Sequence, residues 1–110
     1  MSKYTPDYFE VVKIYRIDKV EHKVFGTWAG GYLNGDSWRL STKIVKVKKV
    51  GQCYQFFGAS GSCYEVHKDT KGTTAYTAGV LKELLEKANL STDIKGELIE
   101  NDMDWTQLEF

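Results

Sequence analysis

Several features that are common in proteins are scarce in this chain of 110 residues. It has a single proline (Pro6), two histidines and two cysteines, and its longest apolar run is far shorter than a membrane-spanning helix requires. The first residues also lack the apolar stretch of a secretory signal peptide. We therefore expect a cytosolic protein that does not enter a membrane.

Few residues are available as metal ligands. Cys53, Cys63, His22 and His67 do not form the short paired spacings that zinc sites use. Cys63 and His67 would share a strand face, but four residues along a strand separate them by about 13 Å. No metal or other cofactor is expected. Without an export signal, free thiols are favoured over a Cys53–Cys63 disulfide, and the pairing is left open.

Signatures of catalysis are also missing. The glycine-rich stretches at 30–31 and 58–62 match neither a phosphate-binding loop nor a dinucleotide fingerprint, and turns alone account for them. The chain holds residue types that nucleophilic catalysis uses, but without a nucleophile-elbow motif. Its acidic residues gather near the C-terminus instead of forming a catalytic pair. We expect a protein that is not an enzyme.

The residues that are abundant favour β-structure. Aromatic residues make up 14% of the chain, and they suit a half-buried pleated sheet. Short stretches rich in strand formers alternate with glycine and asparagine turn signals, which predicts an antiparallel meander of about five strands over 8–67 after a flexible N-terminus at 1–7. The strands are expected at 8–17, 24–29, 37–49, 53–57 and 62–67. Within 37–49 the apolar alternation changes face at Val45, which predicts a β-bulge or a change of environment.

The period then changes to that of a helix. Apolar residues recur at three- and four-residue spacing over 75–88, threonines precede them and Asn89 follows, which predicts one amphipathic helix against the sheet. A short second helix is expected at 91–98, although Gly96 weakens it. The fold class is therefore α+β: one domain over 1–110 with an acidic segment at 90–110.

Charge is divided unequally along the chain. Residues 1–72 hold twelve basic and seven acidic residues, whereas 73–110 hold three and eight. The acidic end also contains large apolar residues, so it resembles a peptide that docks on a partner. The alternative is that it packs back on the domain's own basic sheet, with Trp105 in the core. The candidate partner-binding residues are Asp102, Asp104, Trp105, Leu108 and Phe110, with Tyr32, Trp38 and Arg39 from the glycine-rich loop.

A basic strand supports a second hypothesis. Lysines that follow the backbone of a single-stranded nucleic acid, beside aromatic residues that stack on its bases, are typical of strand-based binders. The neutral net charge of the chain argues against this function. The candidate nucleic-acid or nucleotide-binding residues are Lys43, Lys46, Lys48 and Lys49.

Two stretches give a family resemblance. Residues 26–40 (GTWAGGYLNGDSWRL) and 57–64 (FGASGSCY) resemble small accessory proteins of tailed bacteriophages, over about residues 25–80. The resemblance implies a protein that binds and redirects or inhibits host machinery in a bacterial cytosol, and it transfers no functional residues. The leading hypothesis is therefore a non-enzymatic binding protein with a host protein as partner. The oligomeric state is left open, a homodimer included.

Overall fold

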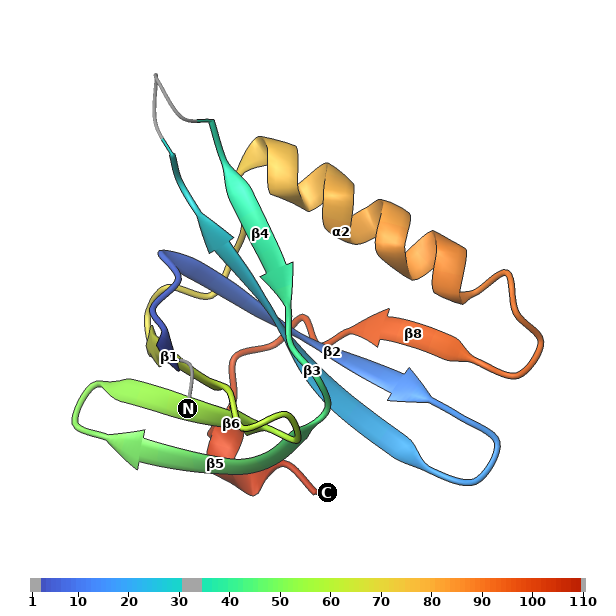
Figure 1. Cartoon of the computed structure of the whole chain (residues 1–110), viewed down its shortest axis with the longest axis horizontal. Coiled ribbons are helices and arrows are strands. Elements are labelled where there is room, and N and C mark those ends of the chain that lie inside the picture. The colour runs from blue at the N-terminus through green and yellow to red at the C-terminus, as the bar shows by residue number, and fades with distance from the viewer. Residues whose placement is uncertain (1–2, 31–34, 110) are drawn as a thin grey trace.

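The computed structural model describes residues 3–30 and 35–109. Over these residues the chain forms eight strands in two four-stranded sheets, with one α-helix and one short 3-10 helix (Figure 1). The α+β class is confirmed. The strands do not form the expected meander of about five, because the chain passes from one sheet to the other partway along.

The first sheet, called sheet B here, is antiparallel throughout. Its strand order is β4-β3-β2-β8. The strands are β4 (Ser37–Leu40), β3 (Val20–Trp28), β2 (Tyr8–Tyr15) and β8 (Lys95–Leu98). The connection between the first two expected strands, at 18–23, is therefore shorter and lies at 16–19, since β2 ends at Tyr15 and β3 begins at Val20.

The second sheet, called sheet A here, contains three strands from the middle of the chain and one from near its start. Its strand order is β1-β7-β6-β5, and β1 pairs in parallel with β7. The strands are β1 (Lys3–Tyr4), β7 (Cys63–His67), β6 (Cys53–Gly58) and β5 (Ile44–Val50). Residues 3 and 4, expected in a flexible N-terminus, thus belong to a sheet.

The expected long strand at 37–49 is two strands in different sheets. Between β4 and β5, Ser41 is buried, and its Oγ accepts a hydrogen bond from the Val24 N–H at 2.8 Å. That bond holds the chain at the corner where it leaves sheet B. The register then shifts between Ile44 and Lys46, as in a β-bulge. The change of face at Val45 therefore marks both a bulge and a change of sheet.

Helix α2 (Ala75–Ala88) has the expected bounds. Thr74 and Thr77 form a capping box at its start, in which each side chain bonds to the other residue's backbone N–H. Asn89 caps the end, where its N–H reaches the Leu85 carbonyl at 3.0 Å. Local sequence is sufficient to specify this element.

The expected second helix at 91–98 is wrong, because this segment contains β8. Its residues pair with the second half of β2, so that Leu98 lies opposite Val12 and Gly96 opposite Ile14. Ladder hydrogen bonds to β2 satisfy backbone groups that a short helix interrupted by glycine would satisfy less well.

Two hydrophobic clusters lie on the two faces of sheet B. The larger cluster fills the space between the sheets and includes the 3-10 helix η1 (Trp105–Gln107). Its buried members are Phe9, Val11, Val24, Ile44, Tyr54, Phe56, Tyr64, Val66, Trp105 and Leu108. The smaller cluster lies beneath α2 and consists of Val12, Ile14, Phe25 and Leu81, with partly buried neighbours.

Candidate partner-binding groove

Helix α2 lies closest to the β8 edge of sheet B. The Asn89 side chain accepts a hydrogen bond from the Gly96 N–H at 2.9 Å and donates one to the Gly96 carbonyl at 3.1 Å. A Cβ at position 96 would lie 3.1 Å from Leu85 Cδ2, so glycine permits the close approach of helix and strand. The end of the helix is thus tied to β8, whereas a hydrogen bond from Thr27 to Thr77 at 3.0 Å ties its start to β3. The sheet face between the end of the helix and β4 is less covered.

A half-enclosed groove of about 210 Å³ lies beside the helix on this face. Its walls are apolar, its two charged residues are basic, and no acidic residue lines it. The lining residues are Val12, Ile14, Arg16, Lys23, Leu40, Leu81, Leu84, Leu85, Ala88 and Ile94. We call it the α2–β4 groove.

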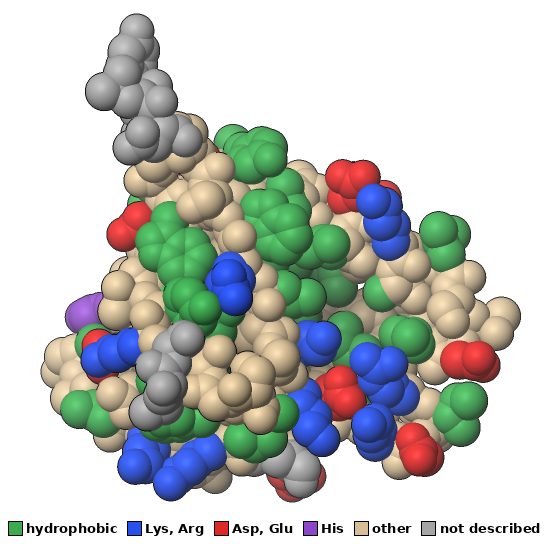
Figure 2. Space-filling model, viewed as in Figure 1, with side chains coloured by type: hydrophobic (Ala, Val, Ile, Leu, Met, Phe, Trp, Pro, Cys, Tyr) green, Lys and Arg blue, Asp and Glu red, His purple; other side chains and the backbone are tan. Residues whose placement is uncertain are grey.

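The apolar surface continues from the groove toward the start of the helix. Trp38 on β4 stacks on Phe25, with ring centroids 5.6 Å apart and an interplanar angle of 17°, yet keeps 39% of its surface exposed. On α2, the helical spacing places Tyr76, Val80 and Leu84 in one row. Figure 2 shows hydrophobic side chains gathered between β4 and α2, with the surface hollowed between the two elements.

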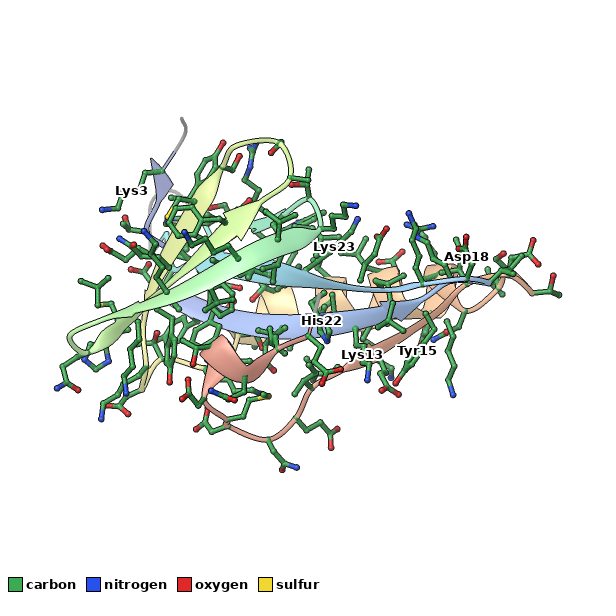
Figure 3. The ribbon with its side chains drawn as sticks, turned by 90° about the horizontal axis from the view of Figure 1, so that it is seen from below. Lys3, Lys13, Tyr15, Asp18, His22 and Lys23 are labelled. Atoms are coloured by element: carbon green, nitrogen blue, oxygen red, sulfur yellow. The ribbon has the colours of Figure 1, made fainter. Side chains whose placement is uncertain are left out.

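The basic side chains of the groove come from the end of sheet B where a turn joins β2 to β3. Lys23 lies opposite Val12 in the register and therefore faces α2, whereas its neighbour His22 lies opposite Lys13 on the other face (Figure 3). Arg16 pairs with Glu21 at 3.3 Å. Lys23 makes no ion pair within residues 3–30 and 35–109. The groove therefore combines an apolar wall with an available positive charge.

The acidic end of the chain is placed differently from the leading hypothesis. Trp105 is 1% exposed and Leu108 is buried with it, so these side chains belong to the core and cannot also fill a groove on a partner in this fold. Asp102 and Asp104 are exposed beside Lys49. Hydrogen bonds from the hydroxyl and backbone N–H of Thr106 hold the pKa of Asp104 below its usual value. The alternative in which this segment packs on its own domain describes residues 105–108 correctly.

The other predicted residues are scattered. Trp38 borders the α2–β4 groove, but its neighbour Arg39 lies on the opposite face of β4, over the Tyr4 ring at 4.6 Å. Tyr32 and Phe110 lie outside the described residues. The predicted nucleic-acid residues are all exposed on β5 or immediately before it: Lys43, Lys46, Lys48 and Lys49.

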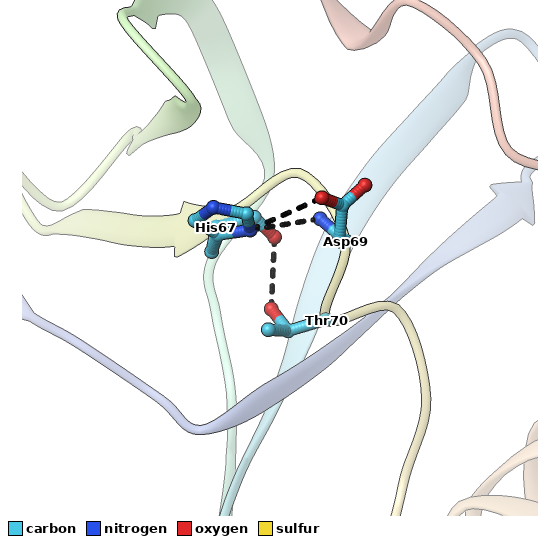
Figure 4. Close-up of polar contacts among 3 residues, drawn as sticks. All are labelled: His67, Asp69 and Thr70. Carbon is cyan, nitrogen blue, oxygen red and sulfur yellow. Dashed lines mark hydrogen bonds and ion pairs between the residues drawn. The ribbon is translucent and has the colours of Figure 1, made fainter.

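Both cysteines are free thiols, and burial raises the pKa of Cys63. His67 closes a turn: its Nδ1 accepts a hydrogen bond from the Asp69 N–H at 3.1 Å, and its carbonyl accepts one from the Thr70 hydroxyl (Figure 4). No group of three or more His, Cys, Asp or Glu residues suited to a metal occurs over 3–30 and 35–109.

The sequence did not point to the basic end of the groove or to its helical wall. Arg16 and Lys23 are ordinary charged residues in strand-like segments, and only their position facing α2 sets them apart. The helical wall of the groove could have been inferred from the sequence, because Tyr76 and Val80 extend the apolar helical period toward the start of the helix.

Comparisons with models of protein families, with characterised proteins and with solved structures found no match to this chain. Within the described part of the chain, no helix combines the length and the apolarity needed to cross a membrane.

Proposed function

We propose that this chain is a non-enzymatic binding protein that holds a macromolecular partner in the α2–β4 groove. The observation that carries the proposal is the groove itself, which is apolar, half open and continuous with Trp38 and Tyr76. Contiguous apolar surface of this kind is typical of interaction sites, and exposed tryptophan and tyrosine often supply much of the binding energy.

The alternative apolar surfaces support binding less well. In the C-terminal segment (residues 99–109), Trp105 and Leu108 are occupied in the core. Most other exposed apolar residues, such as Ile17, Val50 and Leu90, lie at turns or element ends. The resemblance to small bacteriophage accessory proteins favours a bacterial host protein as the partner, which the protein would redirect or inhibit.

Affinity capture from bacterial lysate with paired variants tests the proposal. Tyr76→Glu introduces a charge beside the groove at a side chain that is 59% exposed, so the fold should tolerate it. Val50→Glu makes the same kind of change on β5, at a side chain of similar exposure (51%). Loss of one specific partner with Tyr76→Glu but not with Val50→Glu is expected. Equal capture by both variants and the wild type would contradict the groove as the site.

A second candidate function, binding of single-stranded nucleic acid, has its own supporting observation. On the outer face of sheet A the half-buried ring of Phe57 lies opposite Lys46, with Lys48 Nζ 5.7 Å from its centroid. An aromatic ring between two lysines suits a base and its phosphates. Single-stranded oligonucleotides should then give a salt-dependent mobility shift that Lys46→Glu with Lys48→Glu abolishes. No shift at low salt would remove this candidate.

A further inference from the structure

The enclosed part of the α2–β4 groove has the size of a small ligand. Its volume of about 210 Å³ is smaller than the roughly 300–1,000 Å³ of pockets that hold drug-sized molecules. An apolar cavity of about 150 Å³ holds benzene, so in proportion this groove has room for about eight carbons. Trp38 and Tyr76 are not among the lining residues, so a ligand of this size fills the enclosed part alone.

The lining of the groove is apolar surface that the fold itself does not fully cover. The floor, formed by Val12 and Ile14 of β2, is buried. The side chains around it are only partly buried, and they are Leu40, Leu84, Leu85, Ala88 and Ile94. An alkyl chain in the groove would remove this surface from water, and that burial favours binding.

Lys23 supplies a positive charge at the edge of the groove. The register pairs β4 with residues 25–28 of β3, so β3 is the outermost strand at the level of Lys23. A lysine in such a place lays its stem on apolar surface and keeps its amine near water. Glu21 is two residues away on the same face, but Arg16 at 3.3 Å and Lys19 at 3.2 Å share its carboxylate. Over 3–30 and 35–109, Lys23 itself has no ion-pair partner.

We propose that the groove binds a carboxylate with an alkyl chain of about six to eight carbons, whose carboxylate pairs with Lys23. This inference goes beyond the proposed function, because it assigns a small ligand to the groove whether or not a macromolecular partner also docks there.

Charge and volume together select this class of ligand. No acidic residue lines the groove, so an alkylammonium of the same length finds no counter-ion there. A neutral alcohol leaves Lys23 unpaired. A lipid with two long chains exceeds the volume of the groove.

Titration of the full chain with small amphiphiles tests the proposal. The probes are butanoate, hexanoate, octanoate and dodecanoate, with octanol and octylammonium as matched molecules of different charge. Amide chemical shifts from nuclear magnetic resonance give the affinity and locate the site, and sedimentation gives the oligomeric state of the chain. Octanoate has about ten non-hydrogen atoms, so ordinary ligand efficiency gives a dissociation constant of about 1 mM or tighter.

We expect the affinity to rise about threefold with each methylene up to about eight carbons and then to level off, because further methylenes lie outside the groove. The shifts should be largest at the end of α2 and around Lys23. Octylammonium should bind at least about tenfold more weakly than octanoate.

A substitution that keeps the stem of Lys23 tests the role of its charge. Lys23→Met should remove the preference for octanoate over octanol while octanol binds as before. Lys82→Met is the matched control, since Lys82 is exposed on α2 and does not line the groove. It should leave the preference intact. Equal effects of the two substitutions would refute the pairing with Lys23.

Several results would overturn the proposal. These are no saturable binding up to about 10 mM octanoate, equal binding of octanoate and octylammonium, and chemical shifts confined to sheet A. If the chain sediments as a dimer that octanoate does not bind, a second copy occupies the groove and the proposal is wrong.

Partner capture gives an independent readout. If octanoate binds with the expected charge preference while Tyr76→Glu leaves capture unchanged, the inference stands and the proposed function is wrong. If no carboxylate binds while Tyr76→Glu abolishes capture of a specific partner, the inference is wrong and the proposed function stands.

Discussion

Replacing Trp105 with alanine tests whether the C-terminal segment is part of the core. The Trp105 ring lies between the sheets, with its centroid 6.0 Å from that of Phe9 and 6.2 Å from that of Phe56. Phe9 belongs to sheet B and Phe56 to sheet A, so the tryptophan joins the two. Its removal should leave a cavity that close-packed strands cannot fill by local movement.

The expected loss is large compared with the stability of the domain. Truncating a buried tryptophan to alanine destabilises by about 3–5 kcal/mol, through lost burial and the cavity left behind. Domains typically unfold with a total of about 5–15 kcal/mol. The variant should therefore retain a folded state only marginally, and its urea midpoint should fall by roughly 2 M. Deleting residues 101–110 removes Leu108 as well and should destabilise the fold further.

Urea unfolding followed by far-ultraviolet circular dichroism is the appropriate assay, because the substitution itself changes tryptophan fluorescence. Met103→Ala is the matched control, since Met103 is in the same segment but is 37% exposed. It should cost less than about 1 kcal/mol. If Trp105→Ala also costs less than about 1 kcal/mol, the segment does not hold the sheets together, and Trp105 is again available to a partner.

Further substitutions probe buried polar groups at three places in the fold. The carboxylate of Glu10 lies 2.6 Å from Lys71 Nζ in a mostly buried ion pair. Lys71→Met leaves that carboxylate without its partner and should lower the free energy of unfolding, measured in urea, by about 3–5 kcal/mol. Adding Glu10→Gln should recover part of the loss. Burial, with the charge of Lys13, lowers the pKa of His22 from its usual 6.5. The unfolded chain therefore binds the proton more readily than the folded chain, and the stability of the fold should decrease as the pH drops below 6.5. His22→Gln should reduce that slope in unfolding titrations at successive pH values. Thr77→Val removes the hydroxyl bonded to Thr27 at 3.0 Å and should cost about 1–2 kcal/mol by thermal unfolding, with little added by Thr27→Val.

Elements specified by neighbouring residues could be predicted from the sequence. The bounds of α2 follow from its apolar period, its threonine cap and Asn89, all within one short stretch. The hairpin of β6 and β7 follows from the loop between them, where Gly61 adopts a φ of 91° that favours glycine. These signals depend on contacts that are near in the chain, so composition and spacing record them.

Elements that depend on distant partners could not be predicted. β1 exists because β7 offers an edge to pair with, and β8 exists because β2 does, although neither segment is strongly strand-like by itself. The break after β4 depends on Ser41 bonding to Val24, seventeen residues away. The core position of Trp105 depends on Phe9 and Phe56 meeting from different sheets. None of these pairings leaves a periodic trace in the sequence.

The α2–β4 groove escapes prediction for a related reason. It arises where α2 leaves part of a sheet face uncovered, and a sequence pattern describes the helix itself and not the sheet surface beside it. Trp38 could be singled out as an aromatic residue after a turn, without its stacking on Phe25. Lys23 becomes a candidate only once β3 is known to place it on the helix side.

The fold accounts for part of the unequal distribution of charge along the chain. The acidic C-terminal segment lies beside sheet A, where Asp102 and Asp104 share a shallow depression with Lys49 and Lys68. This part of the basic half already has carboxylates from its own chain. The end of sheet B that carries Lys23 receives none from residues 99–109, and Glu21 on the same strand pairs with Arg16 and Lys19. The positive charge of Lys23 thus coincides with apolar surface that the fold leaves partly uncovered in the α2–β4 groove.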